Sequence, residues 1–195
     1  MSKNLNQKAR VFFDTETTGL NSGEHEIIQV GIVRIEPDGT RTVYQTKIKP
    51  VRLETAQPKA LEINGFTADA WADAPYFTAV ADTIVGLLKG SVVIGHNIPF
   101  DIGFLEADLK AAGRKGFGHH KVDTMTVAYE HLSPIGLDSM ALDKIRDFLG
   151  WSRNGAHTAL HDAETCERLY NLLANSGFWT RTKIRISRRM GWPVK

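Results

Sequence analysis

The stretch that decides the fold is VFFDTETTGL, residues 11–20. Its first three residues are β-branched or aromatic and predict a buried β-strand. Asp14 and Glu16 close this run, and if the chain stays extended, their side chains point to the same face because they are two positions apart. The two carboxylates can then share a cation. Alone this pair is a weak indication, because an Asp after a strand is more often a turn or cap residue.

The residues that follow predict a sheet. Residues 27–35 and 42–48 are again rich in β-branched and aromatic side chains, so with the first run they predict a three-stranded antiparallel start. Pro37-Asp38-Gly39 supplies the turn between the last two strands. A short helix is expected around residues 59–63.

Beyond residue 76 the pattern alternates between helix and strand. Apolar residues at helical spacing predict a helix over residues 77–87, a short apolar strand follows at residues 92–94, and a second helical stripe runs over residues 102–112. This alternation implies parallel pairing through a crossover, and residues 121–123 are a candidate fifth strand. Two further helices are expected over residues 142–149 and 163–173.

Two aspartates lie at the starts of predicted helices. Asp101 comes four residues before Leu105, and Asp162 comes four residues before Cys166, so both lie on or near a core-facing stripe. An unpartnered carboxylate is costly to bury, so each needs a partner. A metal is one candidate; a buried arginine or an exposed helix start is the alternative. For either aspartate taken singly, the favourable interaction of a carboxylate with the helix macrodipole is enough to explain an Asp at the helix start.

His157 precedes Asp162 by five residues, which is about 140° around a helix. The two would not share a face if both were helical, so we expect His157 on a loop that leads into the helix of Asp162. Histidine exchanges protons near neutral pH, and from this loop it could take a proton from an attacking water. A lone loop histidine is more often only solvated, and His161 is an ambiguous neighbour.

If these segments converge, four carboxylates and one histidine meet in one pocket. Because these carboxylates repel one another, such a cluster is unfavourable unless divalent cations neutralise it. The set Asp14, Glu16, Asp101, Asp162 and His157 therefore favours a two-metal hydrolytic centre of the kind found in nucleases.

The overall composition is compatible with one domain. The chain has 195 residues, 42% hydrophobic and 24% charged, and we expect a domain over residues 1–180 with a basic tail over residues 181–195. Of 24 basic residues six lie in that tail, which leaves 18 against 22 acidic residues in the rest. The tail would add sequence-independent attraction to phosphates; a solvated, partly disordered terminus is the alternative.

Cys166 cannot form an internal disulfide, because it is the only cysteine. We expect it to be a small buried side chain in a protein of a reducing compartment. The sequence also has no apolar run long enough to span a bilayer and no signal-peptide pattern near Met1, so the expected location is the cytoplasm.

Three stretches of the sequence resemble the motifs of a known family. The stretches FFDTETTGL (residues 12–20), IGHNIPFD (residues 94–101) and AHTALHDAE (residues 156–164) look like the three motifs of the DEDDh exonucleases. That group belongs to the ribonuclease H-like superfamily and includes the proofreading subunit of the bacterial replicative polymerase. The resemblance covers roughly residues 9 to 176 in order and spacing.

The resemblance implies a ribonuclease H-like α/β fold, with a mixed five-stranded sheet flanked by helices. It implies that the four carboxylates bind two Mg²⁺ or Mn²⁺ ions and that His157 is the general base. It also implies a set of substrate-binding residues: Thr17, Gly19, Leu20, Asn64, Asn97 and Phe100. Gln29 departs from the family, since many members have an acid there, and we expect the change to affect packing rather than chemistry.

The function implied is metal-dependent 3′-to-5′ hydrolysis of single-stranded or frayed DNA ends to nucleoside 5′-monophosphates by a two-metal mechanism. The expected partner is therefore nucleic acid, and no association with a membrane is expected. Three alternatives stay open: a proofreading subunit bound to a DNA polymerase, an RNA-trimming exoribonuclease of the same fold, and a non-catalytic nucleic-acid-binding module. Retention of all five site residues argues against the last.

Overall fold

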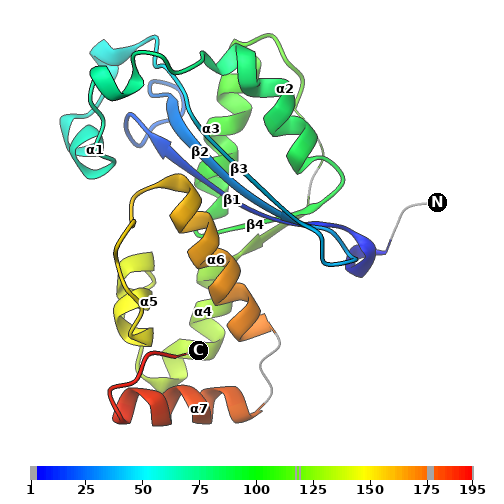
Figure 1. The fold of residues 1–195 in the computed structure, drawn as a ribbon, viewed down its shortest axis with the longest axis vertical. Helices are drawn as coiled ribbons and strands as arrows, with labels where there is room; N and C mark the ends of the chain where they lie inside the picture. Colours follow the sequence, from blue (N-terminus) through cyan, green and yellow to red (C-terminus); the bar gives the residue numbers. More distant parts are fainter. Residues whose placement is uncertain (1–3, 117, 119, 175–177, 195) are drawn as a thin grey trace.

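A mixed five-stranded sheet forms the centre of the protein in the computed structural model, which describes residues 4–116, 118, 120–174 and 178–194 (Figure 1). Its strands are β1 (Arg10–Thr17), β2 (Ile27–Ile35), β3 (Arg41–Lys47), β4 (Val92–Gly95) and β5 (His120–Asp123), in the order β3-β2-β1-β4-β5. β1, β2 and β3 pair antiparallel, whereas β4 pairs parallel with β1 and β5. The predicted sheet, including its antiparallel start and parallel crossover, is confirmed.

The described part of the chain has seven α-helices. They are α1 (Pro58–Ile63), α2 (Phe77–Leu88), α3 (Ile98–Ala111), α4 (Thr124–Leu132), α5 (Leu142–Leu149), α6 (Ala159–Ala174) and α7 (Phe178–Arg189). Of these, α2, α3 and α6 pack on the sheet. Short 3₁₀ turns lie at Leu5–Gln7, Leu53–Thr55, Asp69–Trp71 and Ser133–Ile135. The sequence reasoning missed α4 and α7. The start of α4 has a recognisable cause, because the Asp123 carboxylate accepts a hydrogen bond from the Met125 N–H and so caps the helix.

The two faces of β1 face different helices. Val11 and Phe13 belong to the core that α2 and α3 complete, whereas Phe12 packs in a separate cluster with Ala163 and Cys166 of α6. Cys166 is a free, fully buried thiol, as expected. Since side chains alternate along a strand, the even-numbered residues of β1 that follow Phe12 lie on the α6 face.

The beginning of α6 lies directly on β2 because residue 31 is a glycine. Gly31 pairs with Asp14 across the sheet, and a Cβ atom on Gly31 would overlap backbone atoms of Ala159. The Gln29 side-chain oxygen accepts a hydrogen bond of 2.8 Å from the Ala159 N–H, which satisfies a free donor at the helix start. Gln29 therefore acts in packing and helix capping at this point, and the pair of contacts holds the first turn of α6 beside Asp14.

We expect Gly31→Ala to lower the free energy of unfolding by about 3 kcal/mol, because the added methyl forces the start of α6 away from the sheet. Urea titration followed by circular dichroism measures this change. Gly86→Ala is the control: Gly86 lies inside α2 with open space around it, so alanine there should stabilise by about 0.5–1 kcal/mol. Equal effects at both positions would contradict the close approach of α6 to β2.

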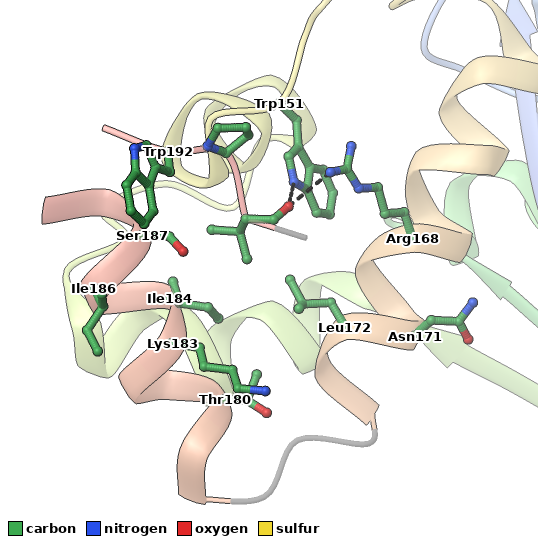
Figure 2. Close-up of a pocket in the computed structure, with 12 residues that line it drawn as sticks. Trp151, Arg168, Asn171, Leu172, Thr180, Lys183, Ile184, Ile186, Ser187 and Trp192 are labelled. Carbon is green, nitrogen blue, oxygen red and sulfur yellow. Dashed lines mark hydrogen bonds between the residues drawn. The ribbon is translucent and has the colours of Figure 1, made fainter. Parts of the chain in front are cut away.

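The C-terminal region forms a third core with α4, α5 and α6. Ile184 of α7 and Val194 are both buried in it. A cavity of about 1030 Å³ lies between α6 and this segment, and the Val194 carbonyl beside it accepts hydrogen bonds from Trp151 and Arg168. Figure 2 shows the side chains that line this cavity. Residues 181–189 of the expected tail are thus helical in the structure, while the division into a domain and a tail at residue 180 stays a prediction. The attraction of these basic residues to phosphates stays a prediction.

None of the helices in the described ranges combines the length and apolar character needed to cross a lipid bilayer.

Candidate metal and catalytic site

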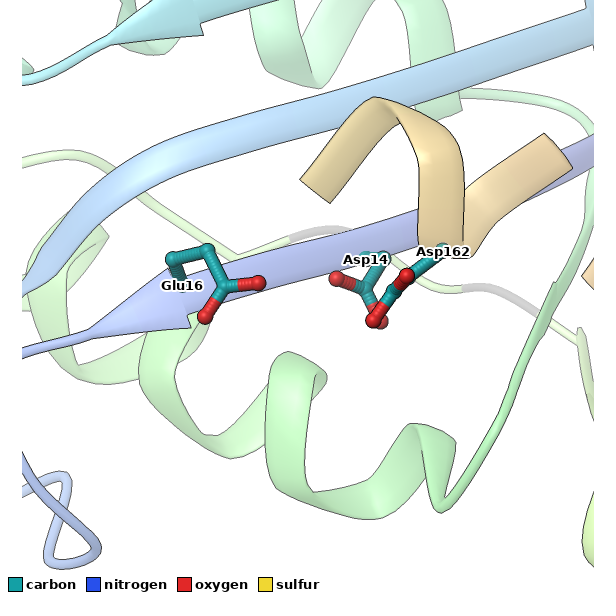
Figure 3. A group of neighbouring side chains, drawn as sticks. All are labelled: Asp14, Glu16 and Asp162. Carbon is teal, nitrogen blue, oxygen red and sulfur yellow. The ribbon is translucent and has the colours of Figure 1, made fainter. Parts of the chain in front are cut away.

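Three carboxylates converge at the end of β1. Asp14 and Glu16 project from the same side of the strand, and Asp162 reaches them from the first turn of α6 (Figure 3). One oxygen of each carboxylate can be chosen so that all three lie within 4.8 Å of one another. The structure thus brings together residues that are almost 150 positions apart in the sequence.

The fourth carboxylate, Asp101, comes from the opposite side of the sheet. It lies in the first turn of α3, buried, and its Oδ1 accepts hydrogen bonds from the Thr15 N–H at 2.9 Å and the Thr15 hydroxyl at 2.7 Å. Thr15 alternates with Asp14 and Glu16 along β1, so it faces α3 while they face α6. Asp101 is nevertheless close enough to repel the Asp14 carboxylate and raise its pKa.

Burial and the charges of neighbouring carboxylates disfavour ionisation of Asp14, Glu16 and Asp101. Burial, followed by the charges of Asp101 and Asp162, raises the pKa of Asp14 well above its ordinary value. The same causes, with burial again the largest, raise the pKa of Glu16 to about 8. Burial raises the pKa of Asp101 to about 7, although its hydrogen bonds from Thr15 act in the opposite direction. At neutral pH these shifts favour the protonated forms of Asp14 and Glu16.

These shifts predict that the metal-free protein loses stability as pH rises. In the unfolded chain Glu16 and Asp101 titrate near 4.5 and 3.8, but in the folded chain near 8 and 7, so between these limits the folded state binds more protons. Their contribution is fully present below the unfolded values and is lost as pH rises through about 7 and 8. We expect Tm in EDTA to fall over this window, and Glu16→Gln to flatten its upper part.

Asp108→Asn is the control for this titration. Asp108 of α3 accepts a hydrogen bond from the Ile27 N–H, away from the cluster, and burial raises its pKa to about 6. Its replacement should alter the lower part of the pH dependence and leave the part above pH 7 unchanged. A wild-type Tm that stays constant across the whole range would contradict the raised pKa values.

Asp162 has a second partner that the sequence reasoning left as an alternative to metal. The Arg146 guanidinium of α5 is 1% exposed and donates a hydrogen bond of 2.6 Å to Asp162 Oδ1. A buried arginine therefore does accompany this carboxylate. No local pattern could have identified Arg146, because its partner lies 16 residues away on another helix.

The donor set suits a divalent cation. The carboxylates of Asp14, Glu16 and Asp162 converge, with Asp101 near enough to raise the pKa of Asp14, so the site keeps a negative excess over the described Arg146 when these groups ionise. Oxygen donors of this kind are what Mg²⁺ and Mn²⁺ prefer, while the lone thiol Cys166 is not among the clustered groups. The residues present therefore fit a hard divalent metal ion.

His157 lies on the loop before α6, as predicted, in a left-handed backbone conformation with φ of 63°. Its side chain is 47% exposed, and its Nε2 lies 3.4 Å from Asp143 Oδ2 on α5. His161 lies one helical turn before Thr165, partly buried and beside Gly155. Of the two histidines, only His157 is on the exposed loop.

The predicted substrate-binding residues near β1 lie together. The Thr17 hydroxyl donates a hydrogen bond of 2.7 Å to the Gly19 carbonyl, and the Asn64 side chain, at the end of α1, donates one of 3.0 Å to the Thr17 carbonyl. Leu20 follows with 75% of its surface exposed. These contacts attach α1 to the segment that leaves β1, so Thr17, Gly19 and Asn64 lie together at this end of the strand.

The other two predicted residues begin α3. Asn97 is exposed with φ of 58°, and its backbone N–H donates to the Asp123 carboxylate at 3.0 Å. Phe100 is half-buried, with its ring centroid 4.8 Å from that of Phe104. No hydrogen bond joins the Asn97 side chain to a metal-ligand candidate among the described residues.

Comparison with known proteins gives a consistent set of similarities. A family model described as an exonuclease (RNase_T) matches residues 11–170. DNA polymerase III subunit epsilon of Treponema pallidum is 32% identical over 161 residues, which is 83% of this chain and 74% of that protein. The Escherichia coli epsilon subunit is 28% identical over 170 residues, covering 83% of this chain and 69% of that protein.

Solved structures agree on the fold. E. coli exonuclease I in complex with a dT13 oligonucleotide has a TM-score of 0.73 at 20% identity, covering 87% of this chain and 41% of that chain. The zinc-bound complex of that protein with single-stranded DNA has a TM-score of 0.74 at 20% identity, covering 94% of this chain and 43% of that chain. This chain spans less than half the length of these proteins but shares the ribonuclease H-like arrangement of their exonuclease fold.

Proposed function

The chain belongs to the exonuclease family that includes the epsilon subunits of bacterial DNA polymerase III, and from this we propose that it removes nucleotides singly from the 3′ ends of single-stranded or frayed DNA. The single observation that carries the proposal is the convergence of Asp14, Glu16 and Asp162, with Asp101 beside them, at one end of the sheet. The charges of neighbouring carboxylates raise the pKa of Asp14 and of Glu16, and a binding-only protein gains nothing from this repulsion.

We propose that the cofactor is a pair of Mg²⁺ or Mn²⁺ ions held by the four carboxylates. When bound, the ions supply Lewis-acid activation of the attacking water and offset charge on the scissile phosphate and the departing 3′-oxygen. Asp14 and Glu16 hold their places through the rigid strand β1, and Asp162 through α6. His157 accepts the proton of the attacking water, and its exposed loop position lets it approach the terminal phosphodiester.

The residues at the end of β1 suit a free chain end. Thr17 and Gly19 offer backbone groups, exposed Leu20 offers an apolar surface on which a base can rest, and Asn64 attaches α1 beside them. Asn97 and Phe100 would contact the sugar or the adjoining base from the start of α3. If these residues close one side of the site around a terminal nucleotide, cleavage would be exonucleolytic rather than internal.

A nuclease assay with the purified chain tests the proposal. Single-stranded DNA, duplex DNA and RNA, each labelled at the 5′ end, are incubated with Mg²⁺, Mn²⁺ or EDTA. A ladder of shortened labelled DNA with either metal, and none in EDTA, is the expected result. Immediate release of labelled mononucleotide would reverse the polarity, preferred cleavage of RNA would favour the RNA-trimming alternative, and intact substrate with every metal would favour a binding module.

A second candidate is a proofreading subunit, because the similar curated proteins include DNA polymerase III epsilon subunits. In that case the same chemistry acts on the mismatched end of a primer while the chain is bound to a polymerase in the cytoplasm. An increase in rate on addition of the polymerase from the same organism, or its co-purification, would favour this candidate over a freestanding enzyme.

A further inference from the structure

Arg146 is a fully buried cation with three described hydrogen-bond partners. Its guanidinium donates to Asp162 Oδ1 at 2.6 Å, Thr165 Oγ1 at 2.9 Å and Asp143 Oδ1 at 2.9 Å. Burying a guanidinium is unfavourable unless its partners are arranged around it. Its Nε has no hydrogen-bond partner in the described part of the chain, so the side chain is fixed by its two terminal nitrogens.

We propose that Arg146 is a positioning residue that fixes Asp162 through Oδ1 and leaves Oδ2 for a divalent cation, an inference that rests on the proposed function. Of the two carboxylate oxygens of Asp162, only Oδ1 accepts a hydrogen bond from a described residue. Hydrogen bonds from outer residues commonly orient metal ligands. The planar guanidinium fork gives this orientation a fixed direction, which an ammonium group does not.

The position of the fork is itself set by its neighbours. Asp143 holds one terminal nitrogen from the preceding turn of α5, and Thr165 holds the other from α6, where its hydroxyl also donates to the His161 carbonyl. Asp162 and Thr165 lie three residues apart, so Arg146 contacts one face of α6 at two points. The guanidinium thereby joins α5 to the turn of α6 that carries the metal ligand.

The same network reaches the proposed general base. Asp143 Oδ1 accepts from Arg146, while its Oδ2 lies 3.4 Å from His157 Nε2. One carboxylate thus contacts both the arginine that holds the metal ligand and the loop histidine. Asp162 lies in the first turn of α6, and His157 lies in the loop before that helix. Contacts with Asp143 and Arg146 of α5 place these two residues relative to each other.

A purely electrostatic role for Arg146 makes the opposite prediction. If the arginine only added positive charge to the pocket, its removal would strengthen binding of a cation. If it positions Asp162, its removal weakens that binding, because Asp162 no longer presents a fixed oxygen. The sign of the change in Mn²⁺ affinity therefore separates the two roles.

The experiment measures Mn²⁺ binding by the full chain after removal of bound metals with EDTA, using electron paramagnetic resonance of the free ion. Arg146→Met should weaken binding by about 10- to 100-fold. Arg146→Lys, which keeps the charge but loses the fork, should stay close to Arg146→Met. Lys144→Met, which removes an exposed cation from the same helix, should bind as the wild type does.

Unchanged or tighter Mn²⁺ binding by Arg146→Met, or full recovery by Arg146→Lys, would overturn the inference. If the wild-type protein itself binds no Mn²⁺, or binds it no better than Asp14→Asn, the proposed metal site fails instead. Should Arg146→Met not fold, Thr165→Val decides, because it keeps the shape and removes one acceptor of the fork. We expect it to weaken binding about fivefold; wild-type affinity in this variant would equally overturn the inference.

Discussion

Asp14→Asn is expected to abolish turnover and at the same time to stabilise the metal-free protein. Asparagine keeps the shape of the side chain but removes the charge that the metal ions need, and ion binding contributes several kcal/mol to catalysis. A loss of about 10³-fold or more in the single-turnover rate on 5′-labelled single-stranded DNA should follow. With the protein at saturating concentration over the DNA, this rate is independent of any change in substrate affinity.

The gain in stability has a separate cause. Burial and the charges of Asp101, Asp162 and Glu16 disfavour the ionised form of Asp14. A neutral amide at this position removes the repulsion. The urea midpoint in EDTA above pH 7 should therefore rise. Asp69→Asn, at an exposed position distant in sequence from these motifs, should change neither property. A near-normal rate in Asp14→Asn would remove the metal assignment even if the variant were stabilised.

His157→Ala should lower kcat by about 10²- to 10⁴-fold, the range expected when a general base is removed. Since His157 is proposed to accept a proton and not to bind the ion, Mn²⁺ affinity should stay within about threefold of the wild type.

His161→Ala is the matched control for this experiment. His161 lies four residues further along the chain, inside the first turns of α6 and against Gly155, whereas His157 is on the exposed loop. Its replacement should leave kcat within a few-fold of the wild type. If His161→Ala lost the activity and His157→Ala kept it, the base would have to be reassigned to His161.

The sequence allowed prediction of those parts of the fold that have a local cause. The strands around β1 and the helices α2, α3, α5 and α6 follow from residue spacing, and the motif around Asp14 places two carboxylates on one face by parity alone. α4 was missed although Asp123 caps it, because Asp123 also ends a strand. α7 was missed because basic residues dominate its sequence, while its packing depends largely on Ile184.

Other features of the site depend on contacts between distant residues. Gly31 is unremarkable within its strand, and only the structure shows that its missing side chain admits the start of α6. Gln29 was expected to affect packing, but its role as a helix cap depends on a residue 130 positions away. Arg146 follows the same rule, since nothing near it in the sequence indicates that its partner is Asp162.

The raised pKa values of the clustered carboxyls have a calorimetric consequence. Because the pKa of Glu16 is about 8 and that of Asp101 about 7, a cation that enters the site at neutral pH must displace hydrogen ions into the buffer. The heat of titration with Mg²⁺ will then differ between buffers of high and low ionisation enthalpy, and the slope of that difference counts the hydrogen ions released.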